Sequence, residues 1–141
     1  MGFSEEEYEQ LKSNMSGKVA PQKKMTKYRN KPTKFRGYTY PSKLEAEKAR
    51  VYHAIVMSGK WRCILRQVKI DLTPHQDEET NYIIDFIAID KSGEAIFIEV
   101  KGRSLPRFKM IKKLWLDWGP GELMVVFKDR TETVPMGQYV K

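Results

Sequence analysis

The sequence predicts an α/β domain with a mixed sheet, in the order helix, three strands, helix, strand. Apolar residues recur at helical spacing in two segments, and four short segments rich in β-branched and aromatic residues are typical of strands. The predicted elements are a helix at about 43–58, strands near 61–72, 81–90 and 94–101, a helix at about 106–117 and a strand at 123–127. We place this domain at residues 38–130, between an N-terminal helix and basic arm at 1–37 and a C-terminal tail at 131–141.

The composition suits one small domain with a nucleic-acid partner. The chain has 141 residues and a formal net charge of +8, which favours a polyanion, nucleic acid before membrane. A basic protein without such a partner is the alternative. Cys63 is the only cysteine, which excludes an intrachain disulfide and favours a cytoplasmic location. No apolar run approaches the roughly 18 residues that span a membrane, so we expect no membrane partner.

A basic segment precedes the predicted domain. Residues 1–15 are typical of a short helix, with Ser4 and Glu7 in capping-box spacing. Residues 16–43 hold nine Lys or Arg, no acidic residue and several aromatics, a mixture that neutralises phosphates and stacks on bases. We expect a DNA-binding arm, and a solvated linker is the alternative. The expected DNA contacts of this arm are Lys23, Lys24, Lys27, Arg29, Lys34 and Arg36.

The first helix of the domain has recognisable ends. Ser42 is suited to cap its start, and Gly59 is suited to end it. Leu44, Val51 and Ile55 lie at helical spacing and form the apolar stripe that we expect to be buried.

The segments 81–90 and 94–101 carry charged residues where apolar ones are expected. Both segments are almost continuously apolar, which is typical of strands buried on both faces. Asp85 interrupts the first segment, and Glu99 and Lys101 interrupt the second. Buried charges persist only when they are paired or bound to a metal. These three side chains are therefore the main candidates for a site.

The length of the connecting loop decides whether these side chains can meet. With a three-residue loop at 91–93 that ends on a glycine of positive φ, Asp85 falls directly opposite Glu99. Lys101 then lies two residues further along the same face. Opposed Cβ atoms are about 5 Å apart, so two carboxylates there can share one Mg²⁺ ion. A two-residue loop would pair Asp85 with Ile98, and a structural ion-pair trio is the alternative to a metal site.

The second helix combines an apolar stripe with a row of lysines. Pro106 fits its first turn, and the Gly-Pro-Gly run at 119–121 ends it. Its expected buried residues are Phe108, Ile111, Trp115 and Trp118. Basic side chains on or before this helix would contact phosphate, or would form a hydrated helix face. These basic residues are Arg103, Lys109, Lys112 and Lys113.

Two motifs of this domain resemble those of the PD-(D/E)xK nuclease superfamily. Asp85 is followed fourteen residues later by Glu99-Val100-Lys101, and the predicted element order matches the restriction-endonuclease-like core of that superfamily. Ser42-Lys43-Leu44-Glu45 resembles the helical acidic motif of phage junction-resolving endonucleases of the endonuclease I type and of transposon-end nucleases. One departure is Ile84, which stands where the superfamily motif nominally has proline.

A family of small phage-encoded nuclease-like proteins is also similar over about residues 38–127. Its recurring features are a Tyr-x-Ser-Lys-x-Glu start, an Arg-Gln strand and an Asp…Glu-Val-Lys-Gly hairpin. In this chain they correspond to 40–45, Arg66-Gln67, Asp85 and 99–102.

The resemblance implies a magnesium-dependent DNA endonuclease. The implied Mg²⁺ ligands, with Mn²⁺ as a possible substitute, are Asp85, Glu99, Glu45 and the carbonyl of Val100. Lys101 would hold or activate the attacking water. Glu45 has capping-box spacing to Ser42 as its alternative role, and Glu47 is the fallback acid. Two positions remain open for the Gln67 side chain: it points from its strand into the active-site cleft, or it is exposed to solvent.

The resemblance also suggests a substrate and a biological setting. Junction-resolving relatives imply branched DNA such as a Holliday junction, in phage recombination or packaging within the host cytoplasm. Two coordinated cuts would favour a homodimer. The alternatives are a non-catalytic nucleic-acid-binding module that keeps a nuclease-like fold, and a role in processing or binding RNA.

Overall fold

The computed structural model describes residues 31–102 and 106–140, and its folded unit begins at Pro32. The predicted helix at 1–15, the arm residues Lys23, Lys24, Lys27 and Arg29, and Arg103 lie outside the described residues. The helices are α2 (Lys43–Met57) and α3 (Pro106–Trp118), and the strands are β1 (Thr33–Phe35), β2 (Tyr38–Tyr40), β3 (Trp61–Asp71), β4 (Asn81–Asp90), β5 (Ala95–Val100), β6 (Leu123–Val126) and β7 (Thr131–Val134).

Five strands form one mixed sheet, in the spatial order β3-β4-β5-β6-β7. The β5–β6 pair is parallel and the other pairs are antiparallel, because α3 carries the chain back across the sheet between β5 and β6. β1 and β2 form a separate two-stranded hairpin beside α2. The predicted order of helix, three strands, helix, strand is confirmed.

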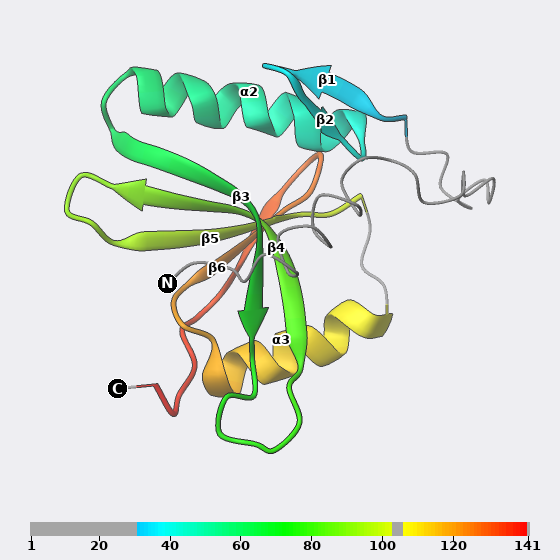
Figure 1. Cartoon of the computed structure of the whole chain (residues 1–141), viewed down its shortest axis with the longest axis vertical. Coiled ribbons are helices and arrows are strands. Elements are labelled where there is room, and N and C mark those ends of the chain that lie inside the picture. Colours follow the sequence, from blue (N-terminus) through cyan, green and yellow to red (C-terminus); the bar gives the residue numbers. More distant parts are fainter. Residues whose placement is uncertain (1–30, 103–105, 141) are drawn as a thin grey trace, which may run out of the picture. The chain divides into compact units, whose positions relative to one another are not determined.

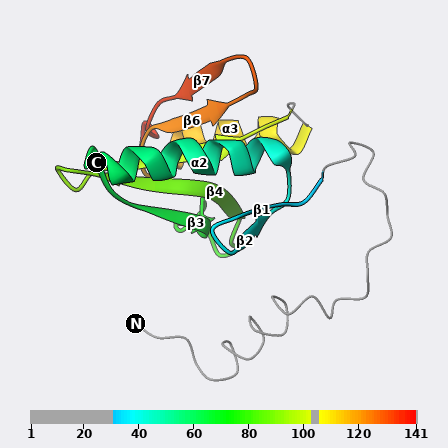
Figure 2. The same cartoon turned by 90° about the horizontal axis from the view of Figure 1, so that it is seen from above.

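The two helices lie on opposite sides of the sheet, and each covers its own apolar core (Figures 1 and 2). The α3-side core consists of Leu72, Tyr82, Ile84, Ile87, Phe97, Phe108, Ile111, Trp115, Leu123, Val125, Phe127 and Val134. The α2-side core consists of Tyr40, Ala46, Ala49, Tyr52, Phe86, Ala88, Ile98, Val100 and Val126. β4 and β5 supply residues to both cores, which is why their sequences are almost continuously apolar.

The register of the central hairpin agrees with the sequence prediction. Phe86 pairs with Ile98 and Ile87 with Phe97, so the next residues inward are Asp85 and Glu99. The loop is the predicted three-residue turn, closed by a hydrogen bond from the Asp90 N–H to the Glu94 carbonyl, 3.0 Å long. Its last residue, Gly93, has a φ of +89°, which is unfavourable for other residues.

Strands β3 and β4 bend together at their middle, as Figure 1 shows. Tyr82 and Ile84 of β4 belong to the α3-side core, but Phe86, two residues further on, belongs to the α2-side core. A regular strand would keep these alternate residues on one face. The neighbouring Gln67 of β3 has a φ of +52°, in the left-handed region. The bend therefore sits at Gln67 and Asp85, and it exchanges the face that each strand buries.

Helix α2 begins where predicted, but it buries a different set of residues. The Ser42 hydroxyl accepts a hydrogen bond from the Glu45 N–H at 3.1 Å, which is an N-cap. The buried residues are Glu45, Ala46, Ala49 and Tyr52. The prediction that Val51 is buried is wrong, because its side chain is 52% exposed. Small alanines let the helix approach the sheet closely, while Leu44 and Ile55 pack at the margins of the α2-side core.

Helix α3 buries Phe108, Ile111 and Trp115, as its apolar stripe predicts. Trp115 donates a hydrogen bond from its indole N–H to the Gly121 carbonyl at 2.7 Å, which satisfies its one polar group. Trp118 is only partly buried and stacks on His75. Among the described residues, no helix is long and apolar enough to cross a membrane.

Three strands lie outside the predicted set. The β1–β2 hairpin turns at Arg36 and Gly37, both with positive φ, which matches the twist of two-residue hairpins. Residues 33–35, assigned from sequence to the basic arm, therefore belong to the folded unit. Strand β7 lies in the segment assigned to the C-terminal tail and pairs with β6.

Candidate metal and nucleic-acid site

Three acidic side chains are buried close together beside the bend in the sheet. Asp85 comes from β4, Glu99 from β5 and Glu45 from the first turn of α2, and they are 7%, 4% and 8% exposed. Asp85 is close to both of the others, since its charge contributes to raising the pKa of each of them. Glu47, the fallback acid, is exposed on α2. The structure thus brings together the acidic residues that the sequence singled out.

Asp85 is held in place by neighbours on both adjoining strands. Its Oδ2 accepts a hydrogen bond from the Val100 N–H at 2.9 Å, and its Oδ1 accepts one from the Gln67 side-chain amide at 3.4 Å. These donors fix the orientation of the carboxylate. The Gln67 side-chain amide reaches Asp85, and the residue as a whole is exposed, so both alternatives of the sequence analysis describe part of its position.

Lys101 provides the positive charge at this site. Its Nζ lies 3.3 Å from Glu99 Oε1 and 4.8 Å from the ring centre of Phe108 on α3. The lysine side chain is 22% exposed, whereas that of Glu99 is 5% exposed. The ammonium group is therefore placed between the buried carboxylate and solvent.

The carboxyl groups of Glu99 and Glu45 resist ionisation in this arrangement. Burial, followed by the charge of Asp85, raises the pKa of Glu99 to about 8, although the Lys101 ammonium acts in the opposite direction. Burial and the Asp85 carboxylate also raise the pKa of Glu45. Burial, followed by the charge of Glu99, raises the pKa of the Tyr82 hydroxyl. A cation placed among these groups would favour their charged forms.

Two carboxylate oxygens at the site lack a partner among the described residues. Glu45 Oε2 and Glu99 Oε2 are buried and accept no hydrogen bond, and the Tyr82 hydroxyl is also without one. Buried polar atoms normally have a partner, so these oxygens suit a bound ion or water. The donor atoms are all oxygens, which are the ligands that Mg²⁺ prefers. The chemistry of this group of residues therefore fits the metal that the sequence implied.

The acidic group offers the ligand atoms that Mg²⁺ prefers, but these atoms are not arranged as a complete coordination shell. Within the described ranges, no three His, Cys, Asp or Glu side chains are arranged so that they could already hold a metal ion. Asp85 is turned towards the Val100 amide, and Glu99 is turned towards Lys101. Binding of a cation would require these side chains to reorient about their own torsion angles.

Gln67 adopts a strained backbone conformation at this site. Its φ of +52° is rare for a residue with a side chain and costs on the order of 1–3 kcal/mol. Such strain concentrates at functional sites, where surrounding structure maintains it. Here it aims the amide at Asp85 across the bend.

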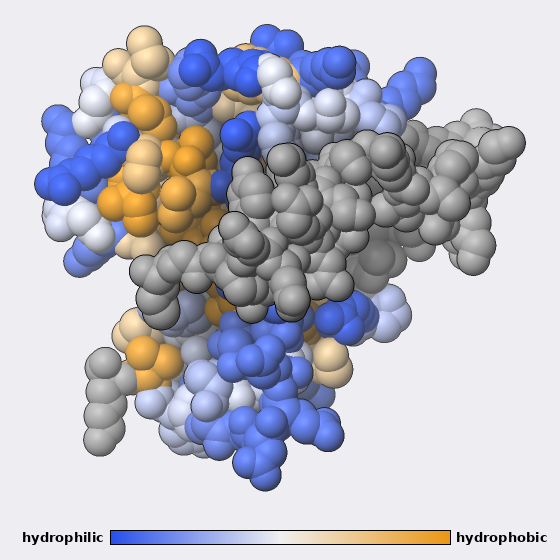
Figure 3. Space-filling model, in the orientation of Figure 1, coloured by the Kyte–Doolittle hydropathy of each residue, from blue (hydrophilic) through white to orange (hydrophobic). Residues whose placement is uncertain are grey.

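The predicted phosphate-binding residues are dispersed over the folded unit. Lys34 and Arg36 are exposed on the β1–β2 hairpin, and Lys109 and Lys113 are exposed on α3. Lys112 is partly buried, and its Nζ lies 3.7 Å from Oε2 of Glu132. Figure 3 shows hydrophilic side chains over much of the visible surface, with an apolar patch beside them.

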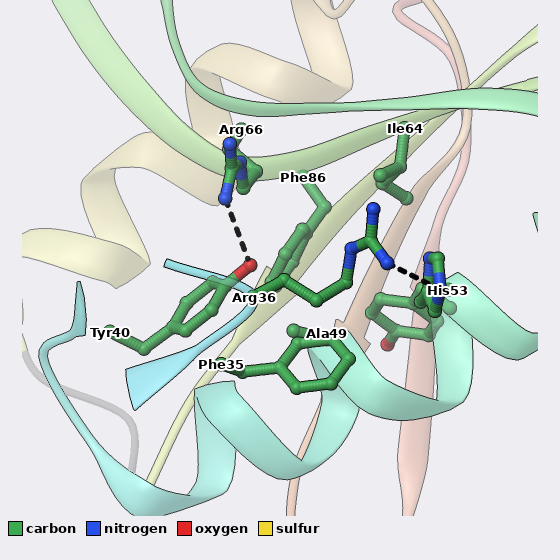
Figure 4. A pocket seen from close by; sticks show the side chains of 9 residues that line it. Phe35, Arg36, Tyr40, Ala49, His53, Ile64, Arg66 and Phe86 are labelled. Atoms are coloured by element: carbon green, nitrogen blue, oxygen red, sulfur yellow. Dashed lines mark hydrogen bonds between the residues drawn. The ribbon is translucent and has the colours of Figure 1, made fainter. Parts of the chain in front are cut away.

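The sequence analysis does not predict the pocket that lies next to the acidic residues. It lies between the β1–β2 hairpin, α2 and strands β3 and β4, with a volume of about 260 Å³ (Figure 4). Its walls are mainly aromatic, and Arg36 and Arg66 reach it from different elements. The signal available in the sequence was the density of aromatic residues before α2, which we assigned to an arm.

Comparison of the chain with protein-family models, with curated proteins and with solved structures found no match. The resemblance to PD-(D/E)xK nucleases therefore rests on the motif residues and on the order of the elements.

Proposed function

We propose that this protein is a magnesium-dependent endonuclease that hydrolyses phosphodiester bonds in DNA, on a restriction-endonuclease-like core. One observation carries the proposal: three buried carboxylates from different elements meet beside a lysine, and two of their oxygens have no partner among the described residues. A purely structural ion pair would satisfy its own polar groups, whereas this cluster leaves two buried carboxyl oxygens without a partner among the described residues.

Asp85, Glu99, Glu45 and the carbonyl of Val100 would hold the Mg²⁺ ion, and Mn²⁺ could replace it. When bound, such an ion polarises a phosphate group and lowers the pKa of a water molecule. The protein's own contribution is to supply charged oxygens in a largely buried place. The two hydrogen bonds to Asp85 keep that carboxylate aligned for this purpose.

Lys101 is the proposed catalytic base or electrostatic catalyst beside these carboxylates. Its ammonium group is tied to Glu99 on the buried side and is open to solvent on the other. From there it would hold the attacking water or donate a hydrogen bond to a phosphate oxygen as negative charge develops. Gln67 acts through Asp85 and is a positioning residue.

DNA is the substrate that the charge favours. The chain has 26 Lys and Arg against 18 Asp and Glu, and exposed basic residues lie on both the hairpin and α3. A preference for branched DNA, a homodimer and a place in phage recombination or packaging are the finer parts of this proposal, and they follow from the resemblance alone.

The test is cleavage of supercoiled plasmid and of a synthetic four-way DNA junction by the full chain, with Mg²⁺ or with EDTA. We expect cutting that requires the metal and that falls at least about 100-fold in Asp85→Asn. Glu45→Gln should lose activity, while Glu47→Gln, two residues along the same helix and exposed, should not. Equal activity with Mg²⁺ and EDTA, or an active Asp85→Asn protein, would overturn the proposal. A matching RNA junction tests the substrate class.

A DNA-binding module without catalysis is the second candidate. It is favoured by the absence, within the described ranges, of three metal-ligating side chains already arranged around one point. This candidate predicts salt-sensitive DNA binding with no cutting in Mg²⁺ or Mn²⁺. Thermal unfolding separates the two candidates further, since metal binding to the folded state should raise the melting temperature of the wild type but not that of Asp85→Asn.

A further inference from the structure

The aromatic pocket in Figure 4 has the features of a binding site for a planar group. Tyr40 and Tyr52 pack on Phe86 with ring centres 5.9 and 5.2 Å apart and form a buried floor, while the partly buried Phe35 lies 5.9 Å from His53. These rings come from β1, β2, α2 and β4, so the hairpin and helix together build the walls. The volume of about 260 Å³ is below the roughly 300–1,000 Å³ typical of pockets for drug-sized ligands. It suits a group of about the size of a single nucleobase.

Two arginines give this pocket a positive edge. Arg36 lies on the hairpin turn, with Nη1 3.2 Å from Nε2 of His53. Arg66 comes from β3, donates a hydrogen bond to the Tyr40 hydroxyl at 3.5 Å and lies over the ring of Tyr38. Neither arginine forms a salt bridge to a carboxylate of a described residue. Their guanidinium groups are therefore available to phosphate, which they bind through paired hydrogen bonds.

The pocket adjoins the acidic site through the chain itself. Phe86 in the pocket wall directly follows Asp85, and Arg66 directly precedes Gln67, whose amide donates to Asp85. Tyr52 is also within electrostatic reach of Asp85, which, after burial, contributes to raising the pKa of its hydroxyl to about 12. The pocket and the acidic group are therefore built from neighbouring residues of β3 and β4.

We propose that this pocket receives one unstacked base of a DNA strand, while Arg36 and Arg66 contact the phosphates on either side of it. This inference rests on the proposed function and specifies its substrate as DNA with an unpaired or displaced nucleotide beside the cut. Aromatic rings stack on any base, so the pocket would recognise an unpaired base of any kind and would not distinguish one base from another. Regular duplex DNA keeps its bases stacked inside and cannot fill the pocket without losing that stacking.

The experiment measures binding in EDTA, where cutting does not interfere. Three labelled DNA duplexes are compared by fluorescence anisotropy: one fully paired, one with a single bulged nucleotide, and one with the same bulge lacking its base. We expect the bulged duplex to bind about 5- to 150-fold more tightly than the base-free bulge, the range expected for stacking of one base. Equal affinity for the two bulges overturns the inference, as does tighter binding of the same bulge in an RNA duplex.

Variants locate the effect in the pocket. Phe35→Ala should remove most of the difference between the two bulges, whereas Tyr139→Ala, an exposed aromatic outside the pocket, should keep it. Arg36→Gln should weaken binding of both bulges, with Arg130→Gln as the control arginine. A preference for the base that persists in Phe35→Ala would place the base elsewhere and overturn the inference. Circular dichroism confirms that each variant is folded.

Plasmid cleavage with Mg²⁺ in parallel separates this inference from the proposed function. Metal-dependent cutting with equal binding of the two bulges supports the nuclease proposal and overturns the inference about the pocket. Preference for the base without cutting supports the pocket within a non-catalytic DNA-binding module.

Discussion

The two sides of the sheet differ in what they bury. On the α3 side, twelve residues form one core whose only polar side-chain groups are the Tyr82 hydroxyl and the Trp115 indole N–H, and Trp115 is fully buried within it. The α2-side core is smaller, uses alanines and tyrosines, and borders Glu45 and the aromatic pocket. Apolar burial is the main source of folding free energy, so the α3 side carries more of the stability.

This difference indicates a division of roles within one small sheet. The acidic group at the bend, the strained backbone of Gln67 and the pocket are features that cost stability and are kept for function. Glu45 and the pocket belong to the α2 side, whereas Glu99 and Lys101 border Tyr82 and Phe108 of the α3-side core. The α3-side core is the platform that tolerates these costs. Substitutions within that core and substitutions in the acidic group should therefore produce opposite patterns of change in stability and activity.

The largest expected effect is on stability, from Trp115→Ala on the α3 side. Removing this fully buried ring should lower the free energy of unfolding by about 3–5 kcal/mol, because it leaves a cavity. Leu116→Ala, on the exposed face of the same helix, should change it by less than about 1 kcal/mol. Urea unfolding followed by circular dichroism measures both. Similar losses for the two variants would show that stability does not depend on the α3-side core.

The second prediction concerns activity and reverses this pattern. Lys101→Ala should reduce the rate of DNA cleavage about 100-fold or more, because the ammonium group beside Glu99 is lost, while DNA binding and stability remain close to wild type. Lys113→Ala, exposed on α3, is the matched control and should cleave normally. Single-turnover cleavage and binding in EDTA provide the two measurements. Wild-type cleavage by Lys101→Ala would remove the lysine from the mechanism.

The third prediction concerns pH and the raised pKa values at the acidic site. Because the folded state holds Glu99 protonated up to about pH 8, it binds more protons than the unfolded state between pH 4.5 and 8. Stability of the metal-free protein should therefore fall as pH rises through this window, by up to about 1.4 kcal/mol per pH unit for each proton. Glu99→Gln should make this fall shallower.

The control for this pH dependence is Glu122→Gln, an exposed glutamate in the turn before β6. It should leave the slope of stability against pH unchanged, as measured by urea unfolding in EDTA at pH 5, 6, 7 and 8. An identical slope in wild type and Glu99→Gln would contradict the assignment of the raised pKa to Glu99.

The smallest expected effect comes from the strained position in β3. Gln67→Gly relieves the positive φ and Gln67→Ala does not, so the glycine variant should be about 1 kcal/mol more stable than the alanine variant. Both lose the hydrogen bond to Asp85 and should cleave DNA more slowly. Urea unfolding of the two variants checks the sign. A more stable alanine variant would mean that the backbone relaxes at this position.

The sequence predicts the main elements well because their periodicity is strong. The register of β4 and β5 follows from a three-residue loop and a glycine at its end, and Asp85 and Glu99 are the residues next to its last pair, Phe86 with Ile98. The β1–β2 hairpin and β7 escape prediction because they are three or four residues long. The hairpin turn, Arg36-Gly37, also lacks the usual Asn-Gly or Asp-Gly signal.

The candidate site could be predicted only in part for a different reason. Two of its carboxylates lie on one hairpin, where local pairing rules apply, but Glu45 arrives through packing of a helix against the sheet. The regular alternation of side chains along a strand does not predict the bend at Gln67, where β3 and β4 change the face that they bury. The pocket depends on the same packing, because its rings come from elements separated in sequence.

The irregular backbone of β3 also affects association between copies of this protein. β3 is an edge of the sheet, eleven residues long, and Leu65 on it is 45% exposed. A long, flat edge of this kind invites strand addition and aggregation. The register shift after Trp61 and the left-handed residue Gln67 leave regular stretches of only four residues, 63–66 and 68–71. The residue that orients Asp85 thus also shortens the edge that another chain could extend.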